Sequence, residues 1–212
     1  MVARASSVAG RRAKSVESFR NCADDLGQIG RGSSIFAVTR GQWSMIDAIL
    51  YAIESCGGPV SISLWTWTVA EYEIATLTRL RMDRRIESGL LVIDGGARLK
   101  NAGLIAEWQG TFGPRSVRYV RNHAKIARVW TDDLRFCLRG SMNLNQNPRF
   151  EQFDLTEGGA DFELVAQIES ELPFVANDAS NGDVITASRV GDAWRPEELA
   201  IFGGGLKTWV PK

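Results

Sequence analysis

The residues 90–94, LLVID, form an unbroken apolar run between two segments with helical spacing. A run of this kind is typical of a strand that is buried on both faces. The segment before it, residues 69–87, places Ile74 and Leu77 on one helical face, and residues 98–110 are predicted to form a further helix. The sequence therefore predicts a buried strand between two helices.

The same alternation of strands and helices extends toward the N-terminus. Residues 34–39 (SIFAVT) and 60–67 (VSISLWTW) are rich in β-forming side chains and are predicted to be strands. Between them a helix begins at Gly41 and ends at Cys56, and it carries one apolar face made of Ile46, Ile49, Leu50 and Ile53. Alternation of this kind predicts an α/β fold with a mixed, largely parallel sheet flanked by helices.

Closely spaced strands follow the third helix. Asp132 and Asp133 form a plausible tight turn, so the strands on either side of them are predicted to pair as a hairpin. A polar loop covers residues 140–149. The remaining predicted elements are strands at 116–120, 123–131, 134–139 and 150–156, and a helix at 161–172.

The chain has 212 residues, which suits one domain with extensions. We place this domain at residues 34–174. Residues 1–33 are basic at their start and rich in Ser and Ala, and we expect a flexible arm there. Residues 175–212 are predicted to be an irregular C-terminal extension. We expect it either to dock through the apolar side chains Trp194, Phe202 and Trp209 or to cover a partner subunit.

Composition narrows the class of protein. The three cysteines, Cys22, Cys56 and Cys137, are widely spaced and odd in number, which favours free thiols in the reducing cytoplasm over a disulfide framework or zinc site. There is no run of about 18 apolar residues, so no membrane partner is expected. The formal net charge is zero, which counts mildly against tight non-specific binding of nucleic acid.

The chemically informative segment is 122–154, and it contains the chain's single histidine, His123. His123 and Lys125 are two residues apart on a predicted strand, so their side chains point to the same face. If the next two strands form a hairpin, Ser141 and Asn143 return to the end of the sheet where His123 begins. Glu151 starts the following strand and can reach the same end.

Phosphodiester transfer requires this set of groups. A neutral imidazole can attack phosphorus covalently, and Lys125, Ser141 and Asn143 can stabilise the charge that develops on the phosphate oxygens. Glu151 can hold the tautomer and orientation of an imidazole. One histidine without a close pair of carboxylates is a poor ligand set for a metal, so we predict no metal and no cofactor.

The spacing His123-x-Lys125, Gly140-Ser141-x-Asn143 and a downstream glutamate resembles the HKD motif of the phospholipase D superfamily. The motif covers about 35 residues, and the predicted elements over 34–172 agree with the family fold. The resemblance implies that His123 is a nucleophile or general acid, that Lys125 and Asn143 bind phosphate, and that Glu151 orients the histidine.

Two positions depart from the family pattern. Trp130 stands where the motif has an aspartate, and the gap from Asn143 to Glu151 is short, so Asp154 is a second candidate for the carboxylate. The family uses two motifs per active centre, whereas this chain has one, so the resemblance implies a homodimer.

Small single-motif members of the superfamily are mostly nucleases, so the expected activity is that of a metal-independent endonuclease acting through a phosphohistidine. Basic and polar residues near His123 are expected to hold the nucleic-acid backbone. The candidate substrate-binding residues are Arg121, Arg128, Asn145 and Arg149.

Two alternatives stay open from the sequence. The first is a catalytically silent, phospholipase D-like DNA-binding protein, which the tryptophan at position 130 favours. The second is a phospholipid-acting enzyme, although members of that kind usually carry two motifs. Trp65 and Trp67 alternate on one strand and are expected in the core, with base stacking as the alternative.

Overall fold

The computed structural model describes residues 11–144, 149–177 and 179–187. Within these ranges the strands form one sheet in the order β1-β7-β6-β5-β2-β3-β4. The strands are β1 (Ser34–Thr39), β2 (Val60–Thr66), β3 (Ile86–Asp94), β4 (Val117–Val120), β5 (Ile126–Trp130), β6 (Arg135–Gly140) and β7 (Glu151–Glu157). The helices are α1 (Arg11–Leu26), α2 (Met45–Ser55), α3 (Glu71–Met82), the 3-10 turn η1 (Gly95–Ala97), α4 (Ala102–Phe112), α5 (Ala160–Glu171) and α6 (Asn181–Ala187).

The sheet is mixed, and the predicted α/β architecture with flanking helices is confirmed. The proportion of parallel pairing is smaller than expected, because only β2–β3 and β3–β4 are parallel and the other four pairings are antiparallel. The helices α3 and α4 provide the crossovers that parallel neighbours require, whereas the described residues between β5, β6 and β7 contain no helix. The predicted hairpin is confirmed: Thr131 donates its backbone N–H to Leu134 O at 2.9 Å.

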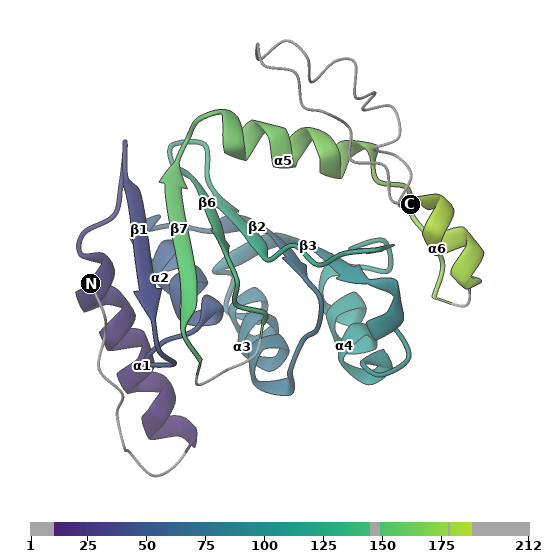
Figure 1. The fold of residues 1–212 in the computed structure, drawn as a ribbon, viewed down its shortest axis with the longest axis horizontal. Helices are drawn as coiled ribbons and strands as arrows, with labels where there is room; N and C mark the ends of the chain where they lie inside the picture. Colours follow the sequence, from purple (N-terminus) through teal and green to yellow (C-terminus); the bar gives the residue numbers. More distant parts are fainter. Residues whose placement is uncertain (1–10, 145–148, 178, 188–212) are drawn as a thin grey trace, which may run out of the picture.

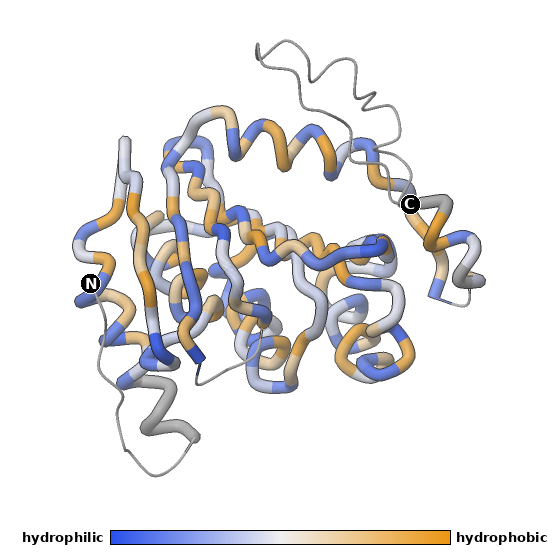
Figure 2. The backbone as a smooth tube through the Cα atoms, viewed as in Figure 1, coloured by the Kyte–Doolittle hydropathy of each residue, from blue (hydrophilic) through white to orange (hydrophobic). Residues whose placement is uncertain are grey.

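Helices cover both faces of the sheet. Helices α1 to α4 lie on one face and α5 on the other (Figure 1). Alternation along β5 follows this division, since Ala127 and Val129 enter the main core whereas Ile126 and Trp130 pack toward α5. The backbone tube likewise changes repeatedly between hydrophobic and hydrophilic along α5 (Figure 2). The fold is thus a helix–sheet–helix sandwich.

The N-terminal segment differs from the expected flexible arm. Residues from Arg11 onward form helix α1, which packs on α2. Cys22 and Leu26 are buried, with Phe19 partly buried on the same helical face, and this stripe of apolar side chains accounts for the docking. Ser18 also donates a hydrogen bond to Asp47 at 2.6 Å. Residues 1–10 lie outside the described residues.

The C-terminal extension is described as far as Ala187. Val175 and Val184 are buried, and α6 contacts β4. Gly95 makes this contact possible, because a Cβ there would lie 2.4 Å from a methyl carbon of Val184. The expected docking side chains Trp194, Phe202 and Trp209 lie outside the described residues. Among the helices that are described, none combines the length and apolar character needed to cross a membrane.

Candidate active site

The predicted catalytic residues gather at one end of the sheet, where β2, β3 and β6 end and β5 and β7 begin. Gly140 at the end of β6 donates its backbone N–H to Lys125 O at 3.1 Å, and Ser141 donates to Gln152 O at 3.2 Å. These bonds place the start of β5, the end of β6 and the start of β7 side by side. Strand pairing therefore brings Lys125, Ser141 and Glu151 together.

His123 and Lys125 form a direct pair. The imidazole is exposed, whereas Lys125 is only 7% exposed. Lys125 Nζ lies 3.1 Å from His123 Nδ1 and donates to the carbonyl oxygen of His123 at 2.6 Å. Burial lowers the pKa of Lys125, and the negative charge of Glu151 acts in the opposite direction. A buried cation thus lies beside an accessible imidazole.

This contact has a consequence for the tautomer of His123. An ammonium group only donates hydrogen bonds, so a neutral ring that accepts at Nδ1 carries its own proton on Nε2. Such a ring presents an N–H group outward. For Nε2 to act as a nucleophile, the proton must move to Nδ1, and Lys125 must then turn to another acceptor.

Ser141 and Glu151 form a second pair at the same end. The Ser141 hydroxyl donates to Glu151 Oε2 and accepts from the backbone N–H of Gln152 at 3.0 Å. Asp154, the second candidate for the carboxylate, lies farther along β7 opposite Arg139 and accepts from the Gln152 side chain at 3.2 Å. Of the two carboxylates, Glu151 is the one at this end of the sheet.

The Asn143 side chain is hydrogen-bonded to the backbone at the end of β2. Its Oδ1 accepts the backbone N–H of Trp67 at 3.3 Å and lies 3.5 Å from the Thr66 hydroxyl. The backbone N–H of Leu144 donates to the same hydroxyl at 3.3 Å. Because Oδ1 is the acceptor in these contacts, the Asn143 amide nitrogen remains the group that can donate toward a phosphate.

Asn122, which no sequence motif singles out, connects the His123 segment to the neighbouring strand ends. Its side chain is buried, and it donates to Thr66 O at 3.0 Å while accepting the backbone N–H of Ala124 at 2.8 Å. Its own backbone N–H donates to Asp94 at 3.0 Å. Asn122 therefore joins the His123 segment to the ends of β2 and β3. The tendency of asparagine to hydrogen-bond the backbone two residues ahead is the sequence signal that could have predicted this role.

Arg128 does not join this cluster. It is 6% exposed and forms an ion pair with Glu169 of α5. Its guanidinium carbon lies 4.6 Å from the ring centroids of both Trp130 and Phe162. The predicted role of Arg128 in holding substrate is therefore not supported by its position, because the side chain is enclosed between the sheet and α5.

Trp130 is likewise remote from His123. It is the last residue of β5, whereas His123 and Lys125 precede the first. Its ring meets Phe162 edge-on at a centroid distance of 5.8 Å. Trp130, which occupies the position of the motif aspartate, therefore makes an aromatic contact with α5. This contact lies at the opposite end of β5 from the imidazole.

The other predicted substrate-binding residues are at the surface or undescribed. Arg121 and Arg149 are exposed, and Arg121 lies two residues before His123. Asn145 lies outside the described residues. Among the residues that the structure describes, no group of three or more His, Cys, Asp or Glu side chains is arranged to hold a metal ion.

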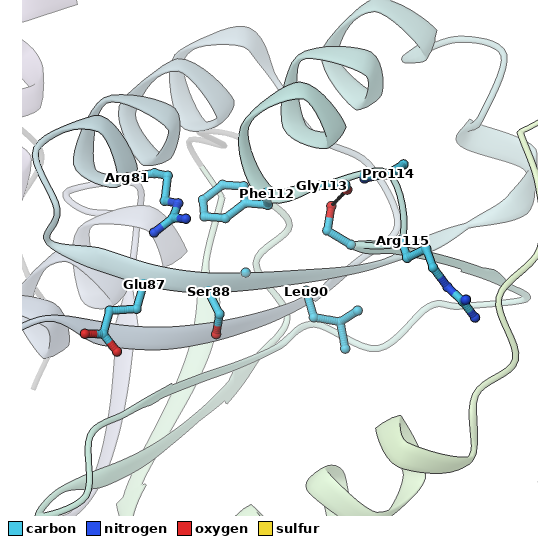
Figure 3. Close-up of a pocket in the computed structure, with 10 residues that line it drawn as sticks. Arg81, Glu87, Ser88, Leu90, Phe112, Gly113, Pro114 and Arg115 are labelled. Carbon is cyan, nitrogen blue, oxygen red and sulfur yellow. Dashed lines mark hydrogen bonds between the residues drawn. The ribbon is translucent and has the colours of Figure 1, made fainter.

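A separate depression of about 460 Å³ lies at the opposite end of β3, between the ends of α3 and α4. Arg81 runs beside the ring of Phe112 toward β3, where it donates to Ile86 O at 3.1 Å, and Arg115 points away from that ring (Figure 3). Gly89 lets the ring approach the strand, since a Cβ there would be 2.7 Å from it. This depression contains none of the residues around His123.

Comparisons with known proteins give limited similarity. No family model and no curated protein matches the chain. A polyphosphate kinase structure from Porphyromonas gingivalis is similar over 65% of this chain and 25% of its own, with 15% identity and a TM-score of 0.45. A phosphatidylserine synthase structure from Haemophilus influenzae covers 65% and 37%, with 16% identity and a TM-score of 0.37. The matched region is thus well under half of either protein.

Proposed function

We propose that this protein is a metal-independent phosphodiesterase of the phospholipase D type that cleaves nucleic acid as a homodimer. The observation that carries the proposal is the pair formed by an exposed His123 and a buried Lys125, with Ser141 and Glu151 on the adjacent strands. A nucleophile, a cation and neutral donors within one small region suit attack on a phosphodiester.

Phosphate binding is the first step of the proposed mechanism. An anionic diester is a better acceptor for the Lys125 ammonium than a neutral ring nitrogen, so Lys125 turns to the phosphate and releases His123 Nδ1. The Asn143 amide nitrogen donates to a second phosphate oxygen. Once released, Nδ1 takes the ring proton and Nε2 acquires the lone pair that attacks phosphorus.

The covalent step exchanges one bond for another. An N–P bond forms at His123 while the bond from phosphorus to the leaving oxygen breaks, and that oxygen takes a proton from a general acid. Water then attacks phosphorus, gives a proton to the same acid–base group and displaces the imidazole. Both half-reactions need a second proton-carrying group next to the phosphate.

The chain has one histidine, so the second group is proposed to be His123 of a second copy. A two-fold arrangement that faces the two exposed imidazoles toward one phosphate would supply it. In that arrangement one ring attacks and the other protonates the leaving oxygen.

The test is digestion of plasmid and single-stranded DNA in EDTA, with wild-type protein and His123→Ala side by side. Cleavage by the wild type and its loss in the variant are expected. Cleavage that persists in the variant would contradict the assignment of the nucleophile. Salt-dependent DNA binding without cleavage would instead favour a silent DNA-binding protein.

Mixing the two proteins tests the shared site. If one centre needs two copies of His123, activity after subunit exchange should fall with the square of the wild-type fraction. A linear fall, or a strict monomer in sedimentation at the assay concentration, would show that one chain is sufficient.

A further inference from the structure

An exposed tryptophan lies beside the candidate nucleophile. Trp67 is 48% exposed, and its ring centroid is 6.1 Å from that of His123, with the planes inclined at 48°. Trp65, two residues earlier, is directed elsewhere: its indole N–H donates to Glu169 at 2.7 Å beneath α5. Of these two tryptophans, Trp67 is therefore the one that presents its ring at the site.

The backbone of Trp67 is tied to the site. Its N–H donates to Asn143 Oδ1 at 3.3 Å, and the preceding residue, Thr66, donates its hydroxyl to Thr68 O at 2.7 Å. The indole consequently lies at a defined place next to the phosphate-binding groups. Covering its apolar surface with a ligand would be favourable, at roughly 25 cal/mol per Å² of surface removed from water.

A second aromatic side chain lies on the other side of the site. Phe150 immediately precedes Glu151 and is 63% exposed, and the Arg40 guanidinium lies 5.3 Å from its ring centroid. Trp67 follows β2 and Phe150 precedes β7, with β5 and β6 between these strands. At about 4.8 Å per strand the two positions are roughly 14 Å apart, with His123, Lys125 and Ser141 between them.

We infer that Trp67 and Phe150 are stacking platforms for the unpaired bases of a single-stranded nucleic acid whose phosphate lies at His123. This inference rests on the proposed function and narrows its substrate class. Stacking on an aromatic ring requires a base with a free face, which a single strand offers and an intact duplex does not. The Arg40 guanidinium beside Phe150 adds a positive charge suited to the backbone.

The test compares binding of two oligomers of equal length and charge, one of thymidylate and one of abasic residues, by fluorescence anisotropy in EDTA. The proteins carry His123→Ala so that turnover is suppressed. Trp67→Ala should weaken binding of the thymidylate oligomer by about 5-fold to 150-fold and leave the abasic oligomer unchanged. Trp67→Phe should retain most of the affinity, and Phe150→Leu should show a loss of the same kind.

Phe174 provides a matched control. It is also an exposed aromatic, 38% accessible, with the Arg115 guanidinium 5.3 Å from its ring centroid. Phe174→Ala should not change the ratio of the two affinities. An equal loss for both oligomers, or a Trp67→Ala protein that no longer dimerises in sedimentation, would overturn the stacking role. Failure to bind the thymidylate oligomer would overturn it as well.

The cleavage assay separates this inference from the proposed function. EDTA-resistant cleavage that requires His123 but is indifferent to Trp67 and to the presence of bases would leave the phosphodiesterase standing and remove the stacking platforms. Base-dependent binding without any cleavage would do the reverse.

Discussion

Two buried cations lie three residues apart, Lys125 just before β5 and Arg128 in the middle of it, and their surroundings differ. Lys125 is 7% exposed and Arg128 is 6% exposed. Arg128 is paired with Glu169 and enclosed by Trp130 and Phe162. Lys125 instead reaches His123, whose imidazole is exposed at the end of the sheet.

The difference shows that burial of a cation does not by itself indicate a function. The charge of Arg128 is compensated by a carboxylate on the helix that covers it, which connects α5 to the sheet. The Lys125 ammonium lies against a ring nitrogen and a carbonyl oxygen, neither of which carries the negative charge of a phosphate. We therefore propose that Arg128 serves stability and that Lys125 serves phosphate binding.

Removal of the Arg128 charge should have the largest effect on stability. Arg128→Met leaves Glu169 buried without its cation, and the free energy of unfolding should fall by about 3–5 kcal/mol. Urea unfolding of this variant, of Glu169→Gln and of the double variant measures the coupling. A double variant no more stable than the sum of the single losses predicts would contradict the pairing.

Lys125→Met should impair cleavage and leave the free energy of unfolding unchanged or higher. Loss of the phosphate-binding ammonium should slow cleavage by about 10²–10³-fold. Burial lowers the pKa of Lys125, so the folded state disfavours its charge and the variant should unfold no more easily than the wild type. Exposed Lys100 supplies the control, since Lys100→Met should change neither quantity. Normal cleavage by Lys125→Met would remove Lys125 from the site.

The spacing of the residues in the sequence predicts part of the difference between Lys125 and Arg128. His123 and Lys125, two apart, were correctly expected to lie together, whereas Lys125 and Arg128, three apart on a strand, must point to opposite faces. Assigning Arg128 to the substrate therefore conflicted with strand geometry. The strand–helix order, the β5–β6 hairpin and the buried run at 90–94 were also predictable, because each depends on local periodicity.

Features that depend on distant pairing could not be predicted. Thr66 and Trp67 reach the site because β2 pairs with β5. No sequence motif around either residue predicts that pairing. The antiparallel direction of that pairing likewise depends on the whole sheet. Helix α1 was missed because its basic residues obscured the apolar stripe at Phe19, Cys22 and Leu26.

A further buried charge, Asp47, should show a smaller effect than Arg128. Its carboxylate accepts from Ser18 and from the backbone and hydroxyl of Ser44, which are neutral donors. Asp47→Ala leaves these donors without their acceptor and should lower the free energy of unfolding by about 1–3 kcal/mol. Thermal or urea unfolding measures it, with the exposed Asp133→Ala as a control. An unchanged stability would show that α1 does not depend on this contact.

The smallest effect is expected in the pH dependence of phosphate binding. Since burial lowers the pKa of Lys125, its ammonium loses its proton at a lower pH than the ordinary value of 10.5. In a His123→Ala background, which has no acid–base imidazole, affinity for a DNA oligomer should therefore decline on the alkaline side below that pH. Lys125→Arg in the same background keeps its charge, so its normalised binding profile should extend to higher pH. Coincident alkaline limbs would mean that another group controls the decline.

The stereochemical course at phosphorus tests the covalent role of His123 most directly. A substrate with one phosphorothioate of defined chirality at the scissile position is cleaved in ¹⁸O-water, and the configuration of the product is determined. Two successive displacements, first by His123 and then by water, predict net retention of configuration. Net inversion would mean that water attacks the diester directly and would contradict a phosphohistidine intermediate.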